Sequence, residues 1–361
     1  MAVDEKKLGE FMGRFVGDLG AVLHAPLIVL GDKLGLYREL AKGPATAAEL
    51  AKKTGTAERY VAEWLAANAA SGYVEYDAGG KKFRMNDEQA FTLADPDSPA
   101  YIPGAFLIAM SMFKDEHKVT DIFRSGKGLG WHEHDKCLFE GTEKFFRPSY
   151  AASLVGSWIP ALEGVRERLE DGGTVADVGC GHGASTILLA KAFPRAKFFA
   201  FDYHPQSIEA AKRAAATAGV ADRITFEVAS AKTFPGPGGS GGISPGKGYD
   251  LVAFFDCLHD MGDPEGAARH VLSTLAPGGS WMIVEPFAHD QLEKNLNPVG
   301  RIFYSASTMI CTPASKSQEV GLALGAQAGE ARLRGVVEAA GFKRFRRATE
   351  TPFNLVLEAK P

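Results

Sequence analysis

The chain has 361 residues, too many for one ordinary domain and a comfortable length for two. Hydrophobic residues make up 45% of the sequence and charged residues 23%, the composition of a soluble globular protein. The formal net charge of −4 excludes a general electrostatic attraction to nucleic acid or to an anionic membrane.

We expect a cytoplasmic protein without a membrane span, a signal peptide or a disulfide framework. The apolar stretch Ala21–Leu30 is short for a span, and Pro26 interrupts it. Acids and lysines are mixed from Asp4 to Lys7, unlike the basic-then-apolar order of a signal peptide. The four cysteines are widely spaced and form no CxxC pair, which favours reduced thiols. They are Cys137, Cys180, Cys257 and Cys311.

Residues 1–95 are predicted to form a small helical domain that ends in a hairpin. Thr46, with Glu49 three residues later, has the spacing of a capping box, and Thr56 is predicted to cap a third helix. Helices are expected at 34–40, after 46 and from 56 to about 70, and strands at 72–76 and 82–85. Three helices followed by a hairpin is the order of a winged helix.

A proline-rich joint, Asp95–Pro99, is predicted to separate this domain from a mostly helical linker and acceptor lid over residues 96–170. Residues 171–361 then alternate between strands and helices, a pattern that builds a parallel sheet covered by helices. Strands are expected at 174–178, 196–201, 223–228, 249–255, 280–285, 343–349 and 353–359, and a flexible stretch at 234–248. The last two strands are separated by so few residues that they must pair antiparallel. The predicted fold class is therefore α/β, with a seven-stranded Rossmann-like sheet that ends in an antiparallel hairpin.

A glycine-rich turn follows the first of these strands and opens a helix. It reads Asp177-Val-Gly179-Cys-Gly181-His-Gly183. Glycines let a ligand lie against the backbone, and a helix N-terminus offers free N–H groups. Asp202 ends the next strand, where an acid accepts hydrogen bonds from ribose hydroxyls. The pattern predicts a nucleotide-like cofactor at this turn.

The glycines alone do not separate NAD from S-adenosylmethionine, because the spacing also satisfies the dinucleotide fingerprint. Asp177 favours S-adenosylmethionine, since a carboxylate there can hold an ammonium group that NAD lacks. The alternative for Asp177 is a buried carboxylate that caps the turn. His182 and Tyr203 flank the motif, where cofactor contact and helix packing are both open.

Two further segments, Asp250–Met261 and Leu275–Pro286, resemble the fourth and fifth strand regions of class I methyltransferases. The string Leu-His-Asp-Met-x-Asp from residue 258 is similar to that of small-molecule O-methyltransferases with an N-terminal winged-helix dimerisation domain. The segments 295–300 and 351–354 are similar to those of mycobacterial winged-helix methyltransferases.

The resemblance implies transfer of a methyl group from S-adenosylmethionine to a small molecule, most simply to its hydroxyl. It implies that His259 is the general base and that Glu285 supports it. It also implies a homodimer through the N-terminal domain, and it places the acceptor pocket at Phe303, Tyr304 and Met309. We expect no metal cofactor, and Tyr203 and Asp256 are further candidate cofactor residues.

Some alternatives remain open on the residues themselves. His259 could instead be structural, bonded to Asp260 or to the backbone. The segment Trp131–Asp135 is rich in metal-ligand residue types, but its ligand count favours a solvated loop or lid. Cys257 and Cys311 could be soft nucleophiles or metalloid ligands, or simply small buried hydrophobes.

Two other functions compete with methyl transfer. One is a DNA-binding regulator with an S-adenosylmethionine-sensing domain, but the third helix offers only Arg59 against Glu58 and Glu63. The other is an NAD-dependent dehydrogenase, which the segments around Asp177 and His259 disfavour. We therefore expect no nucleic-acid partner.

Overall fold

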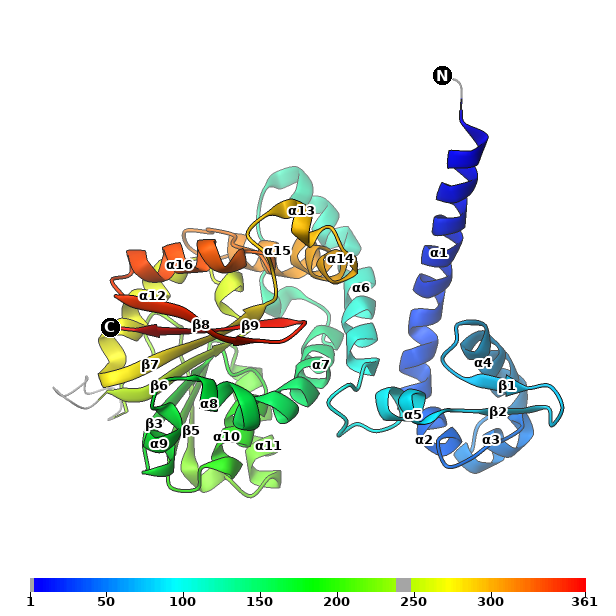
Figure 1. Ribbon diagram of the computed structural model, residues 1–361, viewed down its shortest axis with the longest axis horizontal. Coiled ribbons are helices and arrows are strands. Elements are labelled where there is room, and N and C mark those ends of the chain that lie inside the picture. The colour runs from blue at the N-terminus through cyan, green and yellow to red at the C-terminus, as the bar shows by residue number, and fades with distance from the viewer. Residues whose placement is uncertain (1–2, 238–247) are drawn as a thin grey trace. The chain divides into compact units, whose positions relative to one another are not determined.

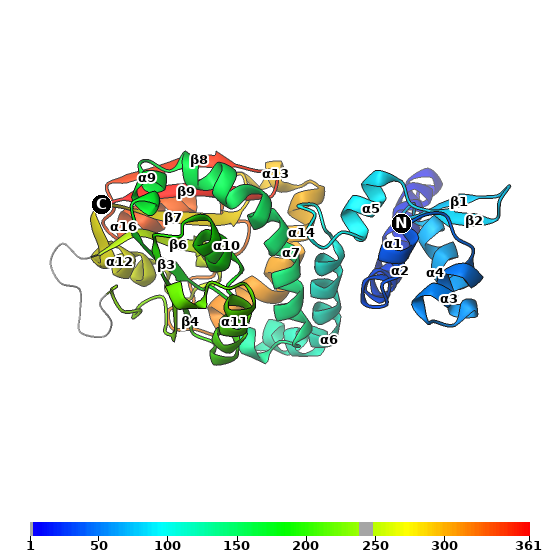
Figure 2. The same ribbon diagram turned by 90° about the horizontal axis from the view of Figure 1, so that it is seen from below.

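The computed structural model describes residues 3–237 and 248–361 (Figures 1 and 2). Most of the stretch predicted to be flexible, 234–248, lies outside the described residues. Contacts divide the chain into two compact units. Unit 1 holds the residues up to Phe113 together with Lys136–Pro148, and unit 2 holds Lys114–Asp135 and Ser149–Pro361. The predicted linker over 96–170 is therefore shared between them, and the division at 95 and 170 stays a prediction.

Unit 1 is built from helices and one small hairpin. Its elements are α1 (Glu5–Lys33), α2 (Leu36–Leu40), α3 (Ala47–Thr54), α4 (Glu58–Ala70), β1 (Glu75–Asp77), β2 (Lys82–Arg84), α5 (Asp87–Leu93) and parts of α6 (Pro103–Ser125) and α7 (Cys137–Ser153). Tyr37 and Trp64 meet edge to face in its core, with ring centroids 4.9 Å apart. The Tyr37 hydroxyl donates to Asn68 Oδ1 at 2.6 Å, which satisfies both buried polar groups. The helices and the antiparallel β1–β2 hairpin confirm the winged-helix order.

One of the two predicted helix caps in unit 1 is confirmed and the other is wrong. Thr46 caps α3 through a complete capping box with Glu49. The N-cap of α4 is Ala57, one residue after the predicted Thr56. The Thr56 hydroxyl lies 2.8 Å from the Thr54 hydroxyl, so it is bonded to the end of α3 and does not reach α4.

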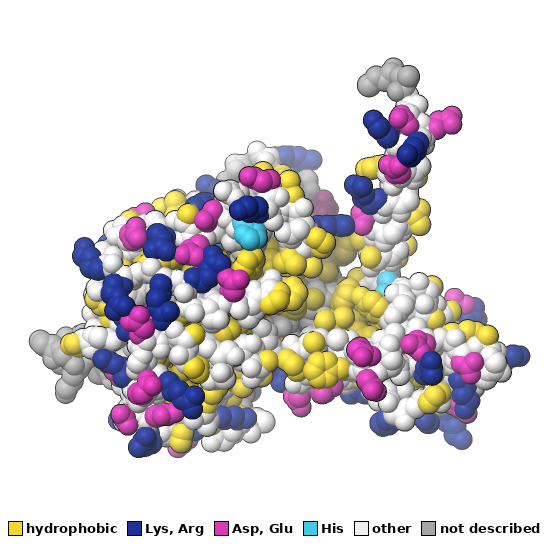
Figure 3. All heavy atoms as spheres, viewed as in Figure 1, with side chains coloured by type: hydrophobic (Ala, Val, Ile, Leu, Met, Phe, Trp, Pro, Cys, Tyr) yellow, Lys and Arg dark blue, Asp and Glu magenta, His cyan; other side chains and the backbone are white. Residues whose placement is uncertain are grey.

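Helix α1 has the length and apolarity that the sequence analysis did not find in any segment. Among the described residues it alone is long and apolar enough to cross a membrane, with a mean hydropathy of 1.4 over its best window and 28% of that window buried. One such helix is weak evidence for a membrane span, because core helices of soluble proteins and signal sequences share its length and hydropathy. Large hydrophobic side chains are exposed along it (Figure 3). They are Leu8, Phe11, Met12, Phe15, Val16, Leu19, Val22, Leu23 and Leu30.

Unit 2 contains a large mixed sheet, and within the described residues it has seven strands in the order β5-β4-β3-β6-β7-β9-β8. The strands are β3 (Thr174–Val178), β4 (Lys197–Asp202), β5 (Ile224–Val228), β6 (Tyr249–Phe255), β7 (Leu275–Pro286), β8 (Arg344–Glu350) and β9 (Asn354–Lys360). The first five run parallel, while β9 pairs antiparallel with both β7 and β8. This order confirms the predicted fold class.

Helices cover both faces of this sheet (Figures 1 and 2). Helices α9 (Val165–Glu170), α10 (Ala184–Ala192) and α11 (Pro205–Thr217) lie on one face, and α12 (Pro264–Thr274) and α16 (Gly329–Ala339) lie on the other. The remaining elements are η1 (Trp131–Glu133), η2 (Leu154–Trp158), α8 (Ile159–Ala161), η3 (Ala221–Arg223), η4 (Leu258–Asp260), α13 (Leu292–Asn295), α14 (Pro298–Ala306), η5 (Ser307–Cys311) and α15 (Thr312–Lys316). Because both faces are covered, the central strands are nearly continuous hydrophobic runs.

The candidate site lies where the strand order of the sheet reverses, between β3 and β6. Chain order runs outward from β3 to β4 and β5 in one direction and from β6 to β7 in the other. Ligands of open α/β sheets bind at such a point, beyond the carboxyl ends of the strands. Asp177, Asp202, Asp256 and Glu285 lie at or just beyond those ends in β3, β4, β6 and β7.

Candidate functional site

The glycine-rich turn after β3 has the backbone conformation that its glycines predict. Gly179, Gly181 and Gly183 have φ values of +76°, +52° and +80°, a region that other residues rarely adopt. A Cβ on Gly179 would lie 2.9 Å from Cys257 Sγ, whereas a Cβ on Gly181 would meet nothing within 4 Å. The turn is therefore packed on one side and leaves open space beside Gly181.

Asp177, in β3 just before this turn, is fully buried. Its Oδ2 accepts hydrogen bonds from the hydroxyls of Ser185 and Thr186, each at 2.6 Å, while its Oδ1 has no hydrogen-bond partner among the described residues. Burial raises the pKa of Asp177 to about 6, against the two hydroxyl bonds. A buried carboxylate oxygen without a donor is costly, and a ligand's ammonium would satisfy it. The capping role and the ligand role of Asp177 are thus divided between its two oxygens.

Asp202 ends β4 and is held by two backbone groups. Its Oδ2 accepts from Gly181 N at 2.9 Å and its Oδ1 accepts from His204 N at 2.8 Å. Burial raises the pKa of Asp202, against these bonds. The first bond joins Asp202 to the glycine-rich turn, so the two predicted cofactor elements form one unit. Tyr203, beside it, is half exposed at 50% and is accessible to a ligand.

Asp256 follows β6 and has a strained backbone, with φ at +49°. Its Oδ2 accepts from the Tyr150 hydroxyl at 2.7 Å and its Oδ1 accepts from Asn354 Nδ2 at 3.1 Å. Burial raises the pKa of Asp256 to about 7, against the Tyr150 bond. The sequence analysis predicted Asp256 but not the Tyr150 contact, since the residues are far apart in the chain and neither stands in a recognisable pattern.

His259 and Glu285 are in contact, as the adjacency of β6 and β7 predicts. The Nδ1 of His259 lies 2.5 Å from Glu285 Oε2, and Glu285 Oε1 accepts from Leu258 N at 2.9 Å. Both side chains are buried, with 3% and 1% of their residue surfaces exposed. Burial opposes a charge on the imidazole, but the carboxylates of Glu285 and Asp260 outweigh it and raise the pKa of His259 well above its ordinary value. The ring is therefore oriented, and the two carboxylates favour its protonated form.

Two further groups lie at the other ring nitrogen: Asp260, which the sequence offered as a structural partner of His259, and Cys311, which it did not bring to this place. Asp260 Oδ1 is 3.1 Å from His259 Nε2, and Cys311 Sγ lies close to both, so that the three donor atoms are within 4.8 Å of one another. Asp260 and Cys311 are buried. The structural alternative for His259, a bond to Asp260, is thus present as a contact without excluding a chemical role.

The segment Trp131–Asp135, whose role the sequence left open, is divided in its contacts. Trp131 Nε1 donates to Asp260 Oδ2 at 2.8 Å, so the segment reaches the site. His134 Nδ1 instead lies 3.0 Å from the buried Asp115, and burial lowers the pKa of His134. Within residues 3–237 and 248–361, the side chains of this segment do not belong to a group of three or more clustered metal-ligand residues.

The predicted acceptor residues lie on α14 and η5. Phe303 is buried, while Tyr304 and Met309 are partly buried. No described hydrogen bond or ion pair joins these three residues to His259. Cys311, two residues after Met309, is the member of this segment that reaches the histidine.

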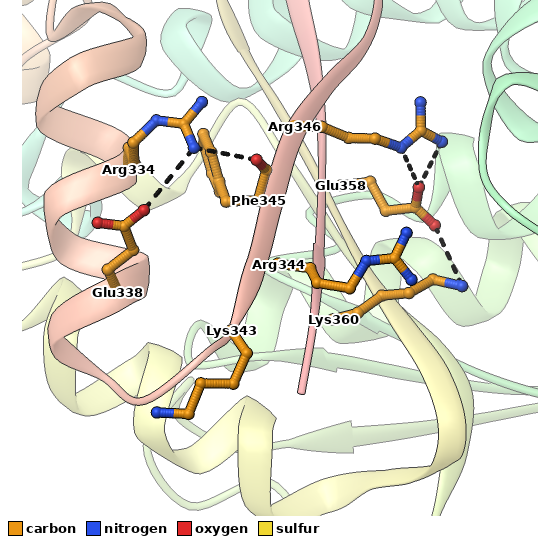
Figure 4. A pocket seen from close by; sticks show the side chains of 8 residues that line it. All are labelled: Arg334, Glu338, Lys343, Arg344, Phe345, Arg346, Glu358 and Lys360. Atoms are coloured by element: carbon orange, nitrogen blue, oxygen red, sulfur yellow. Dashed lines mark hydrogen bonds and ion pairs between the residues drawn. The ribbon is translucent and has the colours of Figure 1, made fainter.

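A charged pocket lies at the opposite end of the sheet, where β8 begins and β9 ends (Figure 4). Its arginines are already engaged: Arg346 pairs with the buried Glu358, and Arg334 donates to the Phe345 carbonyl at 3.0 Å. These contacts are structural, and they lie far along the sheet from Glu285. The pocket is therefore not part of the candidate site.

Two families of known proteins match separate parts of the chain. Residues 169–337 match the family described as "Methyltransferase domain", and residues 23–95 match the "Rv2258c-like winged HTH domain". Norajmaline N-methyltransferase of Rauvolfia serpentina is 25% identical over 180 residues, which cover 47% of this chain and 54% of that protein. The match thus spans about half the length of this curated relative.

Solved structures resemble the whole chain in fold. Human N-acetylserotonin methyltransferase in complex with SAM has a TM-score of 0.68 at 17% identity, covering 100% of this chain and 99% of that one. An O-methyltransferase family protein from Burkholderia thailandensis has a TM-score of 0.66 at 19% identity, covering 100% and 99%. At these identities the likeness establishes the fold.

Replacing Glu285 by Gln should lower the pKa of His259, because it removes the carboxylate that most strongly raises this pKa. Gln keeps the shape and can still accept from Leu258 N. The measurement is an NMR titration of the His259 ring, with Glu338→Gln on the exposed face of α16 as the control. An unchanged titration in Glu285→Gln would show that the Glu285 contact does not govern the charge of the histidine.

Proposed function

We propose that this protein transfers a methyl group from S-adenosylmethionine to a small-molecule acceptor. In its chain, a methyltransferase domain follows a winged helix-turn-helix domain. The observation that carries this proposal is the edge of the sheet where β3, β4, β6 and β7 end. There a glycine turn with open space beside it lies next to Asp177, whose buried Oδ1 lacks a donor.

The ammonium group and the ribose of S-adenosylmethionine each have a matching group at this edge. Asp177 Oδ1 suits the ammonium, which would satisfy the buried oxygen. Asp202 is fixed by two backbone N–H groups and suits the ribose hydroxyls. Tyr203 and Asp256 stand beside these groups, and Gly179, Gly181 and Gly183 let the ligand approach the backbone. NAD has no ammonium, so it would leave Asp177 Oδ1 without a partner.

Replacing Asp202 by Ala should weaken binding of S-adenosylmethionine and S-adenosylhomocysteine by about 1.5–3 kcal/mol, the scale of hydrogen bonds to a charged group. Calorimetry on the full chain measures this effect. Asp222→Ala, on the exposed η3, is the control and should bind like the wild type. Tight NAD binding without heat from S-adenosylmethionine would overturn the cofactor assignment.

The proposed reaction is an in-line displacement in which His259 is the general base. The proton of the acceptor hydroxyl moves to His259 Nε2, the oxygen bonds to the methyl carbon, and the carbon–sulfur bond breaks. Its electron pair stays on sulfur, so the sulfonium leaves as the neutral thioether of S-adenosylhomocysteine. Glu285 holds Nδ1 and stabilises the imidazolium that forms.

A general base must be neutral before it accepts a proton, so the proposed reaction requires that cofactor binding lowers the raised pKa of His259. In the free protein, Glu285 and Asp260 favour the protonated ring. A sulfonium bound close by repels the imidazolium, which favours the neutral ring that a base requires. Binding of the cofactor would thus prepare the histidine for the acceptor.

The acceptor is proposed to lie between this edge and the segment that carries Phe303, Tyr304 and Met309, whose apolar side chains suit an aromatic or aliphatic small molecule. Oxygen is the proposed acceptor atom because His259 stands ready to take a hydroxyl proton. Relatives methylate nitrogen as well, by their names, so a panel of hydroxyl, amine and thiol acceptors monitored by S-adenosylhomocysteine release decides the class.

His259→Ala should lower turnover by about 10²–10⁴-fold, the usual cost of removing a general base, while the affinity for S-adenosylmethionine stays near that of the wild type. In the wild type, turnover should rise with pH as the imidazolium loses its proton, because only the neutral ring accepts one. The turnover of His259→Ala should lack this rise with pH.

The matched control for this experiment is His117→Ala, an exposed histidine on α6. It should keep both the rate and the pH profile. Full turnover of His259→Ala with an unchanged pH profile would make the histidine structural and leave proximity as the source of catalysis.

The competing regulator function has little support in the N-terminal domain. In α4, the third helix of the winged-helix order, the single base Arg59 is paired with Glu63, which removes its free charge. A helix that reads DNA needs donors for phosphates and base edges. Specific nanomolar binding to a DNA library at physiological salt would revive this alternative.

We further propose a cytoplasmic homodimer that forms through residues 1–95, with no membrane and no nucleic-acid partner. The exposed hydrophobic side chains of α1 are a surface that water solvates poorly and that a second copy would cover. Sedimentation of the full chain should show a dimer, and Phe11→Glu with Phe15→Glu should shift it to a monomer. A monomeric wild type at micromolar concentration contradicts the proposal.

A further inference from the structure

We infer that His259, Asp260 and Cys311 form a binding site for one thiophilic divalent cation, zinc by the chemistry of the donors. An imidazole nitrogen, a carboxylate oxygen and a thiol sulfur lie within 4.8 Å of one another, and all three residues are buried. Zinc in proteins takes these three donor types, at about 2.0–2.3 Å each. The expectation from the sequence was that the protein has no metal, and it rested on the ligand count of the segment Trp131–Asp135.

The first observation that points to a cation is that two buried carboxylates face one imidazole ring. Asp260 Oδ1 pairs with His259 Nε2 at 3.1 Å, and Glu285 Oε2 pairs with His259 Nδ1 at 2.5 Å. The two carboxylates carry more negative charge than one imidazolium offsets, and a divalent cation held by Nε2 and Oδ1 would offset it.

The second observation is that His259 and Asp260 each use their other polar atom, the one that would not bind the ion, in a hydrogen bond to the protein. His259 Nδ1 is bonded to Glu285, which fixes the ring with Nε2 facing Asp260 and Cys311. Asp260 Oδ2 accepts from Trp131 Nε1, which leaves Oδ1 for the ion. Carboxylate–histidine pairs of this kind orient metal ligands in proteins and tune their basicity. The donors are therefore arranged before any ion arrives.

The donor set selects the ion. A thiolate is a soft ligand that favours zinc over magnesium or calcium, both of which prefer oxygen. Three protein donors leave a fourth tetrahedral position for water or for a small molecule. Magnesium should therefore not compete at this site.

This inference rests on the proposed function in one respect: the ion would occupy His259 Nε2, the nitrogen that removes the acceptor's proton. Zinc and the acceptor's proton compete for the same lone pair, so bound zinc should inhibit methyl transfer. The site would make the enzyme active when zinc is scarce and inactive when it is abundant.

The test uses the full chain, stripped of metal with a chelator and titrated with zinc against a chromophoric competitor. We expect one ion per chain, and with cobalt(II) in place of zinc an absorption from charge transfer between sulfur and cobalt. Cys311→Ala should lose that absorption and bind zinc about 100-fold more weakly or worse, while Cys137→Ala, a buried cysteine outside the site, should behave like the wild type. Trp131→Phe, which removes only the donor to Asp260 Oδ2, should weaken zinc by about 10–100-fold.

Turnover is measured on the same samples, each relative to its own metal-free rate, and S-adenosylmethionine binding is measured by calorimetry. Zinc should inhibit the wild type reversibly, and Cys311→Ala should need about 100-fold more zinc for the same inhibition. The metal site is overturned if the wild type binds no zinc or if Cys311→Ala binds it equally well. Inhibition is overturned if zinc leaves turnover unchanged or raises it. If zinc binds as expected but S-adenosylmethionine does not, the metal site stands and the proposed function falls.

Discussion

The gathering of four carboxylates, three of them buried, at one edge of the parallel strands is the constraint on which the rest of unit 2 depends. Asp177, Asp202, Asp256 and Glu285 lie near one another because parallel strands end at the same edge and the strand order reverses between β3 and β6. Buried acids are costly unless hydrogen bonds or cations offset their charge. The neighbouring backbone and side-chain donors therefore serve these acids before they serve any ligand.

Those donors only partly offset the cost of burying the negative charges, and the pKa values of the acids show what remains. The pKa of Asp177 is raised to about 6 and that of Asp256 to about 7, so both acids take up protons readily in the free protein. A cationic ligand would replace these protons as the source of positive charge. An edge with this electrostatic character discriminates by charge first, and it favours the sulfonium cofactor over its neutral product.

Local patterns in the sequence predicted the parts of the fold that local physics decides. The capping box at Thr46 and Glu49 is complete within four residues, and the central strands β3, β4 and β6 are short apolar runs that predict buried strands. The contact between His259 and Glu285 was predictable because strand adjacency follows from the α/β order. Thr56 failed as a cap because its hydroxyl found a partner on the preceding helix.

The contacts that the sequence did not reveal are those made between distant segments. Cys311 reaches His259 from η5, and Trp131 reaches Asp260 from the segment before α7, with no spacing rule to announce either contact. Tyr150 on Asp256 is a third example. All three depend on how loops outside the sheet fold back over its edge, which a single sequence does not encode in any periodic pattern.

Strand β8, at one border of the large sheet, has a consequence for how copies of this protein meet. A border strand presents unpaired backbone groups to which another chain could add a strand, a common route to aggregation. Arg344, Arg346 and Arg347 stand on β8 and are held by acidic partners, so an incoming strand would have to displace several ion pairs and bury charge. The ion pairs on β8 thereby disfavour the addition of a strand from another chain at this border.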